Sequence, residues 1–275
     1  MKTILETSPQ KQLEEFLLNY NKIQPIDLDK AKKDIMLLIK YYRGTPEVRD
    51  ELVDLIRLEN QWYSALENDQ IDYSVYNDKY YFADTWACWS VYSRIYLKNI
   101  QKNEYLKHIL TTNCKSILDL GCGIAYSTAA LKELFPKMDV NCTDLENTKR
   151  YKFCKEMSKK YDFNLYPSLT KISKPIDLIF ASEYFEHIEA PGDELDEIVN
   201  KFNPKYLILA NAFNTRSVGH FIKYKQGGVT CLDQKEATKH FNYRLREMYG
   251  YKKLYLGFWN DRPNVWERND IFYQR

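Results

Sequence analysis

The sequence lacks several features that would define a protein class at once. No apolar run approaches the ~20 residues that cross a bilayer, and residues 1–15 contain no apolar core of signal-peptide length. None of the six cysteines forms a C-x-x-C pair, which argues against a zinc site. The formal net charge is only +2, too small to indicate a nucleic-acid partner by itself. We therefore expect a soluble, cytoplasmic protein with reduced cysteines and no membrane partner.

Hydrophobic patterning divides the chain into two regions. Residues 1–112 show helical periodicity, with helices expected at residues 10–20, at 27–42, from 46 onward and at 85–109. From residue 113 on, short apolar runs alternate with amphipathic stretches, and the runs are 116–120, 139–143, 176–181 and 206–211. This alternation predicts a parallel sheet with crossover helices.

The end of the chain departs from this alternation. Two strand-like runs, 252–259 and 264–273, are joined by a short turn, so they are expected to pair antiparallel. The whole pattern predicts an α/β domain of residues 113–275. Residues 1–112 are then a helical extension that serves as a cap, a lid or an assembly region.

Glycine is scarce, yet two of the nine glycines stand close together after the first strand, in Asp119-Leu120-Gly121-Cys122-Gly123. Glycine lets the backbone turn sharply and approach a ligand, and ligands of open parallel sheets bind at these strand ends. The dinucleotide motif G-x-G-x-x-G requires a third small residue, where this chain has Tyr126. A ligand without a pyrophosphate is therefore favoured. The phosphate loop G-x-x-x-x-G-K-[ST] is absent.

An acidic residue ends the second expected strand. Asp144 can accept hydrogen bonds from both hydroxyls of a ribose, and Glu146 is the weaker candidate. The alternative role is a turn residue that caps the following helix. Because strand, glycines and acid agree, we predict that Asp144 binds a ribose.

These residues resemble the cofactor motif of a known superfamily. Residues 117–123 are similar to motif I of the class I S-adenosylmethionine-dependent methyltransferases, and Asp144 matches their ribose acid. The resemblance covers residues 110–275. It implies a Rossmann-like, mostly parallel seven-stranded sheet with a C-terminal antiparallel hairpin. It also implies S-adenosylmethionine as cofactor, with Asp119, Gly121 and Gly123 beside its methionine part.

The segment after the fourth strand is the candidate reaction centre, because in this superfamily it faces the cofactor's methyl group. Glu183, a candidate cofactor contact, is followed there by Glu186 and His187, and the three share one face if the segment is helical. Such a set could bind Mg²⁺ or Mn²⁺. Alternatively, the site is metal-free and His187 is a base for a hydroxyl acceptor, whose pKa starts near ~10 in a phenol.

Two branches of the superfamily are similar to this segment. They are the ubiquinone-pathway catechol-type O-methyltransferases and the small-RNA 3′-terminal 2′-O-methyltransferases, both with Glu-x-x-Glu-His and both metal-assisted. The RNA branch has a further histidine beyond strand five, where this chain has His220 in a sequence that otherwise matches poorly. His220 is therefore a fourth candidate metal ligand.

Candidate acceptor contacts come from two segments. Aromatic residues crowd the segment before the sheet domain, where Trp86 could stack on an acceptor ring. The alternative for these aromatics is a seam that joins the helical region to the sheet. After the fifth strand, Arg216 and His220 lie in a loop that lines acceptor pockets in the superfamily.

Three functions compete. The leading hypothesis is O-methylation of a small-molecule or nucleotide-like hydroxyl, and the second is RNA-terminal 2′-O-methylation, which requires a basic surface. The third is a non-catalytic binding or assembly protein, against which the intact cofactor residues argue. DNA base amino-methylation is disfavoured, because no Pro-Pro-aromatic motif follows the fourth strand, and no Pro-Cys nucleophile for C5-cytosine methylation follows it either.

Overall fold

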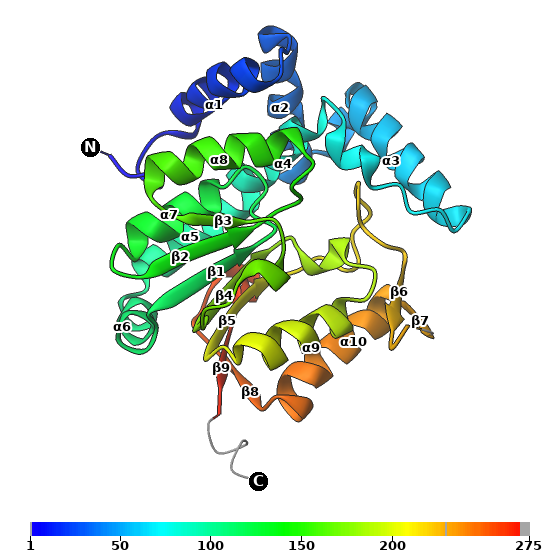
Figure 1. Ribbon diagram of the computed structural model, residues 1–275. Helices are drawn as coiled ribbons and strands as arrows, with labels where there is room; N and C mark the ends of the chain where they lie inside the picture. Colours follow the sequence, from blue (N-terminus) through cyan, green and yellow to red (C-terminus); the bar gives the residue numbers. More distant parts are fainter. Residues whose placement is uncertain (1, 229, 270–275) are drawn as a thin grey trace.

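The computed structural model describes residues 2–228 and 230–269, which form an α/β fold around one large sheet (Figure 1). Its strand order is β3-β2-β1-β4-β5-β9-β8. The first five strands in this order are parallel, whereas β9 runs antiparallel to both β5 and β8. The predicted Rossmann-like, mostly parallel seven-stranded sheet with its C-terminal antiparallel hairpin is confirmed. The strands are β1 (Ser116–Leu120), β2 (Asp139–Thr143), β3 (Asn164–Tyr166), β4 (Leu178–Ser182), β5 (Tyr206–Ala210), β8 (Tyr251–Leu254) and β9 (Asn264–Arg268).

Helices cover both faces of this sheet. Figure 1 shows α5, α7 and α8 over one face and α9 and α10 over the other. These helices are α5 (Arg94–Lys102), α7 (Tyr126–Leu134), α8 (Lys149–Tyr161), α9 (Pro191–Phe202) and α10 (Gln234–Tyr243), with α6 (Glu104–Asn113) leading into β1. Across the described ranges, no helix combines the length and apolarity that crossing a membrane requires.

The bounds of the four predicted parallel strands agree closely with the structure. Strands β1 and β2 begin and end at the predicted residues, and β4 and β5 differ from prediction by one or two residues. Every residue of β1 and β5 is buried, because the strands lie inside the sheet and both faces are covered. Strands that are buried on both faces have continuous apolar sequences, and this made them recognisable in the sequence.

The N-terminal region is helical, as predicted, but more broken than its periodicity indicated. Helices α1 (Pro9–Ile23) and α2 (Leu28–Tyr42) start where Ser8 and Asp27 accept hydrogen bonds from backbone N–H groups. The single helix expected from residue 46 is wrong. A 3₁₀ segment η1 (Pro46–Glu51) ends at Leu52, whose non-helical backbone separates it from α3 (Val53–Glu67).

The long helix expected at residues 85–109 is also divided. It comprises α4 (Tyr81–Cys88), a π-helical turn η3 (Trp89–Ser93), α5 and α6. Asn103 interrupts it, since its side chain accepts from Leu106 N and starts α6 anew. A 3₁₀ turn η2 (Tyr73–Asn77) lies between α3 and α4.

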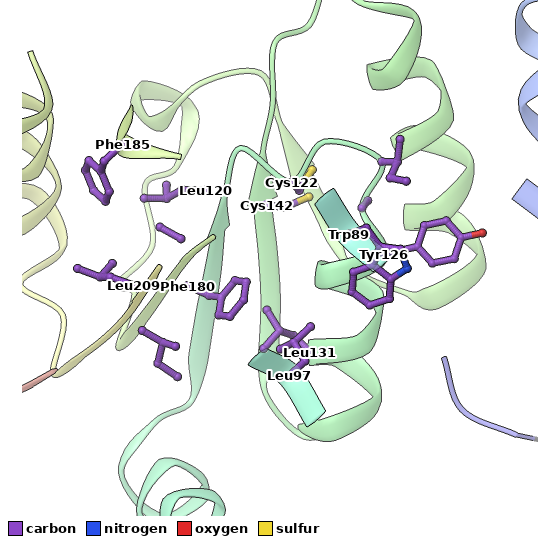
Figure 2. Packing of buried hydrophobic residues seen from close by; sticks show 14 of the residues in the cluster. Trp89, Leu97, Leu120, Cys122, Tyr126, Leu131, Cys142, Phe180, Phe185 and Leu209 are labelled. Carbon is purple, nitrogen blue, oxygen red and sulfur yellow. The ribbon is translucent and has the colours of Figure 1, made fainter. Parts of the chain in front are cut away.

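Aromatic rings join the N-terminal helices to the sheet domain. Phe16 of α1 stacks on Trp86 of α4 at 4.6 Å between ring centroids, and it also meets Phe153 of α8 edge-on at 5.3 Å. In Figure 2, Trp89 lies against Tyr126 at the start of α7. One hydrophobic cluster thus contains residues of both regions. The boundary at residues 112 and 113 stays a prediction.

Three strands and one helix among the described residues were not predicted. They are the edge strand β3, helix α10, and the two strands of a separate hairpin, β6 (Lys223–Gln226) and β7 (Thr230–Asp233). The last two predicted strands are shorter than expected, since β8 ends at Leu254 and β9 at Arg268. The part of the predicted final strand at residues 270–273 lies outside the described residues.

Candidate functional site

Two adjoining cavities open at the carboxyl ends of β1, β2 and β4. The first cavity has a volume of about 410 Å³ and the second of about 600 Å³. The residues that line both are Tyr81, Gly121, Arg150, Glu183 and His187. A ligand that spans both cavities would therefore pass over the glycine loop, as sequence analysis predicted for the cofactor.

The glycine loop needs glycine for two reasons. Gly121 and Gly123 both have φ of +61°, in the left-handed region that disfavours side chains. A Cβ atom on Gly121 would also lie 2.5 Å from the Tyr184 ring, and one on Gly123 would lie 2.7 Å from the Thr85 methyl. Neighbouring side chains thus pack directly onto the loop backbone, where they leave room only for glycine.

Asp119 connects the end of β1 to the start of α7. The hydroxyls of Ser127 and Thr128 both donate to its Oδ2 at 2.6 Å. Burial raises the pKa of Asp119 to about 8, even though these two hydrogen bonds lower it. Asp119 lines the first cavity beside the loop, in the position expected for a contact with the cofactor's methionine part.

Asp144 fixes the second side of the loop. Its carboxylate accepts from Gly123 N at 2.5 Å and from Leu145 N at 2.7 Å, and it lines the second cavity. Burial raises the pKa of Asp144 to about 6. Each carboxylate oxygen keeps one lone pair for a ribose hydroxyl. The alternative candidate, Glu146, is exposed and lines neither cavity.

The two glutamates after β4 are placed differently from each other. Glu183 adopts a left-handed backbone (φ +53°), and the 3₁₀ turn η5 begins only at Phe185. The expectation that Glu183, Glu186 and His187 share a helical face is therefore wrong. Glu183 lines both cavities and accepts from Tyr96 Oη at 3.3 Å, whereas the fully buried Glu186 lines neither and accepts from Ala212 N at 2.9 Å.

These two carboxyl groups interact beneath the cavities. Burial raises the pKa of each carboxyl group, and the neighbouring Glu183 charge raises that of Glu186 further. Glu186 is thus the more readily protonated of the two, and its Oε2 has no hydrogen-bond partner among the described residues. Arg262 also favours the charged form of Glu183, since its guanidinium reaches into the first cavity from the β8–β9 connection.

Two histidines meet at the boundary of the cavities. The rings of His187 and His220 are perpendicular, with centroids 4.6 Å apart. His187 Nδ1 is 3.2 Å from Tyr76 Oη. Burial, with the neighbouring His220 and Arg150, holds the pKa of His187 well below its usual value, so the ring is neutral near pH 7.

His220 is oriented by the backbone. Its Nδ1 lies 2.7 Å from Thr215 O, and because a carbonyl only accepts, Nδ1 carries the proton and Nε2 keeps the lone pair. Burial lowers the pKa of His220 to about 4. Helix α3 holds this loop in place, since Trp62 Nε1 donates to His220 O at 2.7 Å and Tyr63 Oη donates to Ser217 O at 3.0 Å.

The predicted metal ligands do not form a metal site. Among residues 2–228 and 230–269, no three or more His, Cys, Asp and Glu side chains are grouped so as to hold a metal ion. Glu186 Oε1 accepts from Ala212 N, and His220 Nδ1 donates to Thr215 O. The prediction of Mg²⁺ or Mn²⁺ at Glu183, Glu186, His187 and His220 is thus unsupported by the donor geometry.

The remaining two predicted acceptor contacts lie in different places. Arg216 lines the first cavity, with its guanidinium 4.2 Å from the centroid of the Tyr63 ring. Trp86 is 1% exposed, stacks on Phe16 and lines neither cavity. This position corresponds to the aromatic seam considered as the alternative, and Trp89 is the tryptophan that lines the first cavity.

Sequence reasoning missed several residues that line the cavities. Asp84 of α4 lines the first cavity and accepts a hydrogen bond from Tyr42 Oη, and burial raises its pKa to about 6. Arg150 and Arg262 were missed too. No spacing marks these residues, since only tertiary packing brings them to the cavities.

Fold and site together define the class of protein, a Rossmann-like methyltransferase domain. The comparison with family models agrees, as the model described as a methyltransferase domain matches residues 90–250. The chain belongs to this family of methyltransferase domains. No curated protein matches the sequence.

Solved structures extend the comparison at the level of the fold. PigF with SAH is 13% identical, with 80% of this chain and 72% of that chain covered at a TM-score of 0.52. The plantazolicin methyltransferase BpumL, in complex with a pentazolic desmethylPZN analog and SAH, is 13% identical over 67% of this chain (TM-score 0.39). An O-methyltransferase family protein from Burkholderia thailandensis is 10% identical over 70% of this chain (TM-score 0.44). The chain spans 61% of BpumL and 63% of the Burkholderia protein, less than two thirds of either.

Proposed function

We propose that this protein transfers a methyl group from S-adenosylmethionine to a hydroxyl of a small-molecule or nucleotide-like acceptor. The observation that carries the proposal is the position of His187. It lies where the two cavities meet, beside the glycine loop, and its lowered pKa keeps the imidazole neutral near pH 7, with a ring nitrogen free of a proton. A hydroxyl acceptor has to lose a proton on methylation, so a neutral base at this point fits O-methylation.

The glycine loop and its acids would hold the cofactor. Asp144 lines the second cavity, where the ribose would bind, and Asp119, Gly121 and Gly123 line the first, where the methionine part would bind. Glu183 lies between them at the end of β4. When bound, S-adenosylmethionine supplies a methyl group on a positively charged sulfur and leaves as S-adenosylhomocysteine. The residues contribute position and charge, which account for much of the acceleration in such a displacement.

The far side of the first cavity fits an acceptor with a ring. Its aromatic lining residues are Tyr41, Tyr42, Tyr81, Trp89, Tyr92 and Tyr126. Arg216 and His220 from the loop after β5 provide polar contacts there, with His220 Nε2 available as an acceptor. Planar acceptors such as phenols or nucleosides would pack on these rings while their hydroxyl faces His187.

Cofactor binding is tested first, by calorimetric titration with S-adenosylhomocysteine. Asp144→Asn keeps the size of the side chain and removes its charge, and we expect affinity to fall by about 10-fold or more because charge-assisted hydrogen bonds to the ribose are lost. Glu146→Gln is the matched control and should bind like the wild type, since Glu146 lines neither cavity. Equal affinities in all three proteins would contradict the assignment of the ribose site.

Turnover is tested next, as S-adenosylhomocysteine formed with a panel of catechols, hydroxybenzoates, ribonucleosides and a short RNA. We expect turnover with at least one free hydroxylated compound, and His187→Gln should lower its kcat by roughly 10²–10⁴-fold without weakening S-adenosylhomocysteine binding. Binding without turnover on the entire panel would contradict the proposal. Turnover on the RNA alone would favour the RNA-terminal hypothesis instead.

A further inference from the structure

Arg150, the second residue of α8, lies at the junction of the two cavities and lines both. Only 7% of the residue is exposed, which is unusual for an arginine. The Tyr81 ring lies 4.8 Å and the Tyr76 ring 5.7 Å from its guanidinium carbon, so aromatic rings of the N-terminal region hold the group in place.

The guanidinium has far more donors than partners. It carries five N–H groups, of which Nη1 reaches Thr85 Oγ1 at 3.4 Å. Nη2 forms an ion pair with Asp144 Oδ1 at 3.8 Å, which is too long for a hydrogen bond, and Nε is buried with no partner. Buried donors without an acceptor are costly. The deficit therefore indicates a ligand that brings acceptor oxygens to this junction.

Asp144 does not meet this need. Its two oxygens already accept from Gly123 N and Leu145 N, and they face the cavity in which the ribose is placed. A guanidinium is best satisfied by a carboxylate or a phosphate, which accept two parallel N–H bonds at once. A neutral hydroxyl or amide would offer fewer acceptor oxygens to these N–H groups.

The surroundings indicate which anion this is. A Cβ atom on Gly123 would lie 4.0 Å from Arg150 Nη1 and 2.7 Å from the Thr85 methyl, so both side chains stand over the glycine loop. If the ribose binds at Asp144, the other end of S-adenosylmethionine would extend over this loop into the first cavity. The carboxylate of that end is the cofactor's one anionic group.

We propose that Arg150 binds the carboxylate of the methionine part of S-adenosylmethionine, with Thr85 as a second donor. This inference rests on the proposed function and assigns one more residue to its cofactor site. It makes the N-terminal region part of that site, because Tyr76, Tyr81 and Thr85 position the guanidinium or share its ligand.

The test compares two cofactor products by calorimetric titration. One is S-adenosylhomocysteine, and the other is 5′-(3-aminopropylthio)-5′-deoxyadenosine, the same molecule without its carboxylate. In Arg150→Gln we expect affinity for S-adenosylhomocysteine to fall on the order of 10- to 100-fold, as for a lost charge-assisted pair, while affinity for the decarboxylated compound changes less than about 3-fold. Lys149→Gln removes the same charge from the neighbouring exposed position and should change neither affinity.

The ratio of the two affinities is measured on one preparation, so partial unfolding of a variant cancels. Arg150→Lys provides a second variant that keeps the charge and loses the paired donors, and its ratio should fall between those of wild type and Arg150→Gln. Equal losses for both compounds would overturn the proposal by assigning Arg150 to the adenosine part or to Asp144. No loss for either would assign it to the acceptor and overturn it as well. Failure of the wild type to bind S-adenosylhomocysteine would contradict the proposed function instead.

Discussion

The site has two sides, a floor of strand ends and a roof of N-terminal residues, and different interactions hold the two in place. The floor consists of Asp119, Gly121, Gly123, Asp144 and Glu183 at the ends of parallel strands. Its geometry is set by local backbone: two left-handed glycines and hydrogen bonds from Ser127, Thr128, Gly123 and Leu145. A floor of this kind binds through groups whose positions are fixed by short stretches of chain.

The roof consists of Tyr42, Tyr76, Tyr81, Asp84 and Trp89 from the N-terminal region. It is held by packing between distant segments, such as Phe16 on Trp86 and Trp62 on the loop that carries His220. Its phenols have raised pKa values because they are buried, and the raised pKa of Tyr42 is accompanied by a hydrogen bond to Asp84. The roof therefore shapes the cavity by volume and ring surface, and it supplies few charges.

The largest effect on stability and on cofactor affinity is expected when one methyl group is added to the floor. In Gly121→Ala, the new Cβ would clash with the Tyr184 ring at 2.5 Å and force a side chain into φ +61°. We expect a loss of roughly 2–4 kcal/mol in stability and a fall in S-adenosylhomocysteine affinity of about 100-fold or more. Thermal melts and calorimetric titration measure the two effects.

Gly227→Ala controls for backbone strain, since Gly227 has a similar φ of +56° with no atom within 4 Å of the added Cβ. It should cost about 1 kcal/mol in stability and leave cofactor affinity unchanged. A floor that tolerates Gly121→Ala without loss of affinity would contradict the view that backbone geometry defines it.

A smaller effect is expected on the pH dependence of the free energy of unfolding, to which Asp119 contributes. Because the folded protein raises its pKa from 3.8 to about 8, Asp119 stays protonated in the fold at pH values at which the unfolded chain releases the proton. Its contribution to stability is thus fully present below pH ~4 and is lost as pH rises toward 8. Between pH 5.5 and 8 the loss amounts to about 3 kcal/mol.

Asp119→Asn should remove this part of the decline while keeping an oxygen for the Ser127 and Thr128 hydroxyls. Denaturant unfolding of ligand-free wild type and variant at several pH values gives the difference curve, from which the other titrating groups cancel. Those groups include His187 and His220, whose lowered pKa values act in the opposite direction below pH 6.5. Parallel pH profiles of the two proteins would show that Asp119 is ionised in the fold.

The same division explains what the sequence could predict. Asp119, Gly121, Gly123 and Asp144 stand at fixed positions relative to two buried strands, so the strand ends and the turn between them could be recognised from local pattern. The periodicity that gave the helices 10–20 and 27–42 is local as well. The floor and the sheet were therefore predictable before any contact was known.

The roof could not be predicted, because its residues meet only after folding. Arg150 is an ordinary cation on an amphipathic helix in sequence, and only tertiary packing places it under Tyr81. The metal hypothesis is unsupported for a related reason: the spacing of Glu183, Glu186 and His187 assumed a helix, whereas Glu183 has a left-handed backbone and the described residues contain no group of ligands that could hold a metal ion. Similarly, nothing in the composition distinguished Trp86, in the seam, from Trp89, in the cavity.

The smallest expected effects would separate these two tryptophans. Trp86→Phe removes part of a buried stack on Phe16 and should cost about 1–3 kcal/mol in stability, with S-adenosylhomocysteine affinity within about 2-fold of wild type. Trp89→Phe removes a buried Nε1–H that has no partner in this structure, so it should cost less in stability. Because Trp89 lines the cavity beside the glycine loop, its loss should weaken ligand binding by about 3- to 10-fold. Thermal melts and titrations on the same preparations give both quantities. The opposite result, in which Trp86→Phe weakens binding and leaves stability unchanged, would contradict this assignment. Trp86 of α4 would then belong to the ligand site, and the packing residues of the roof could no longer be separated from the binding residues.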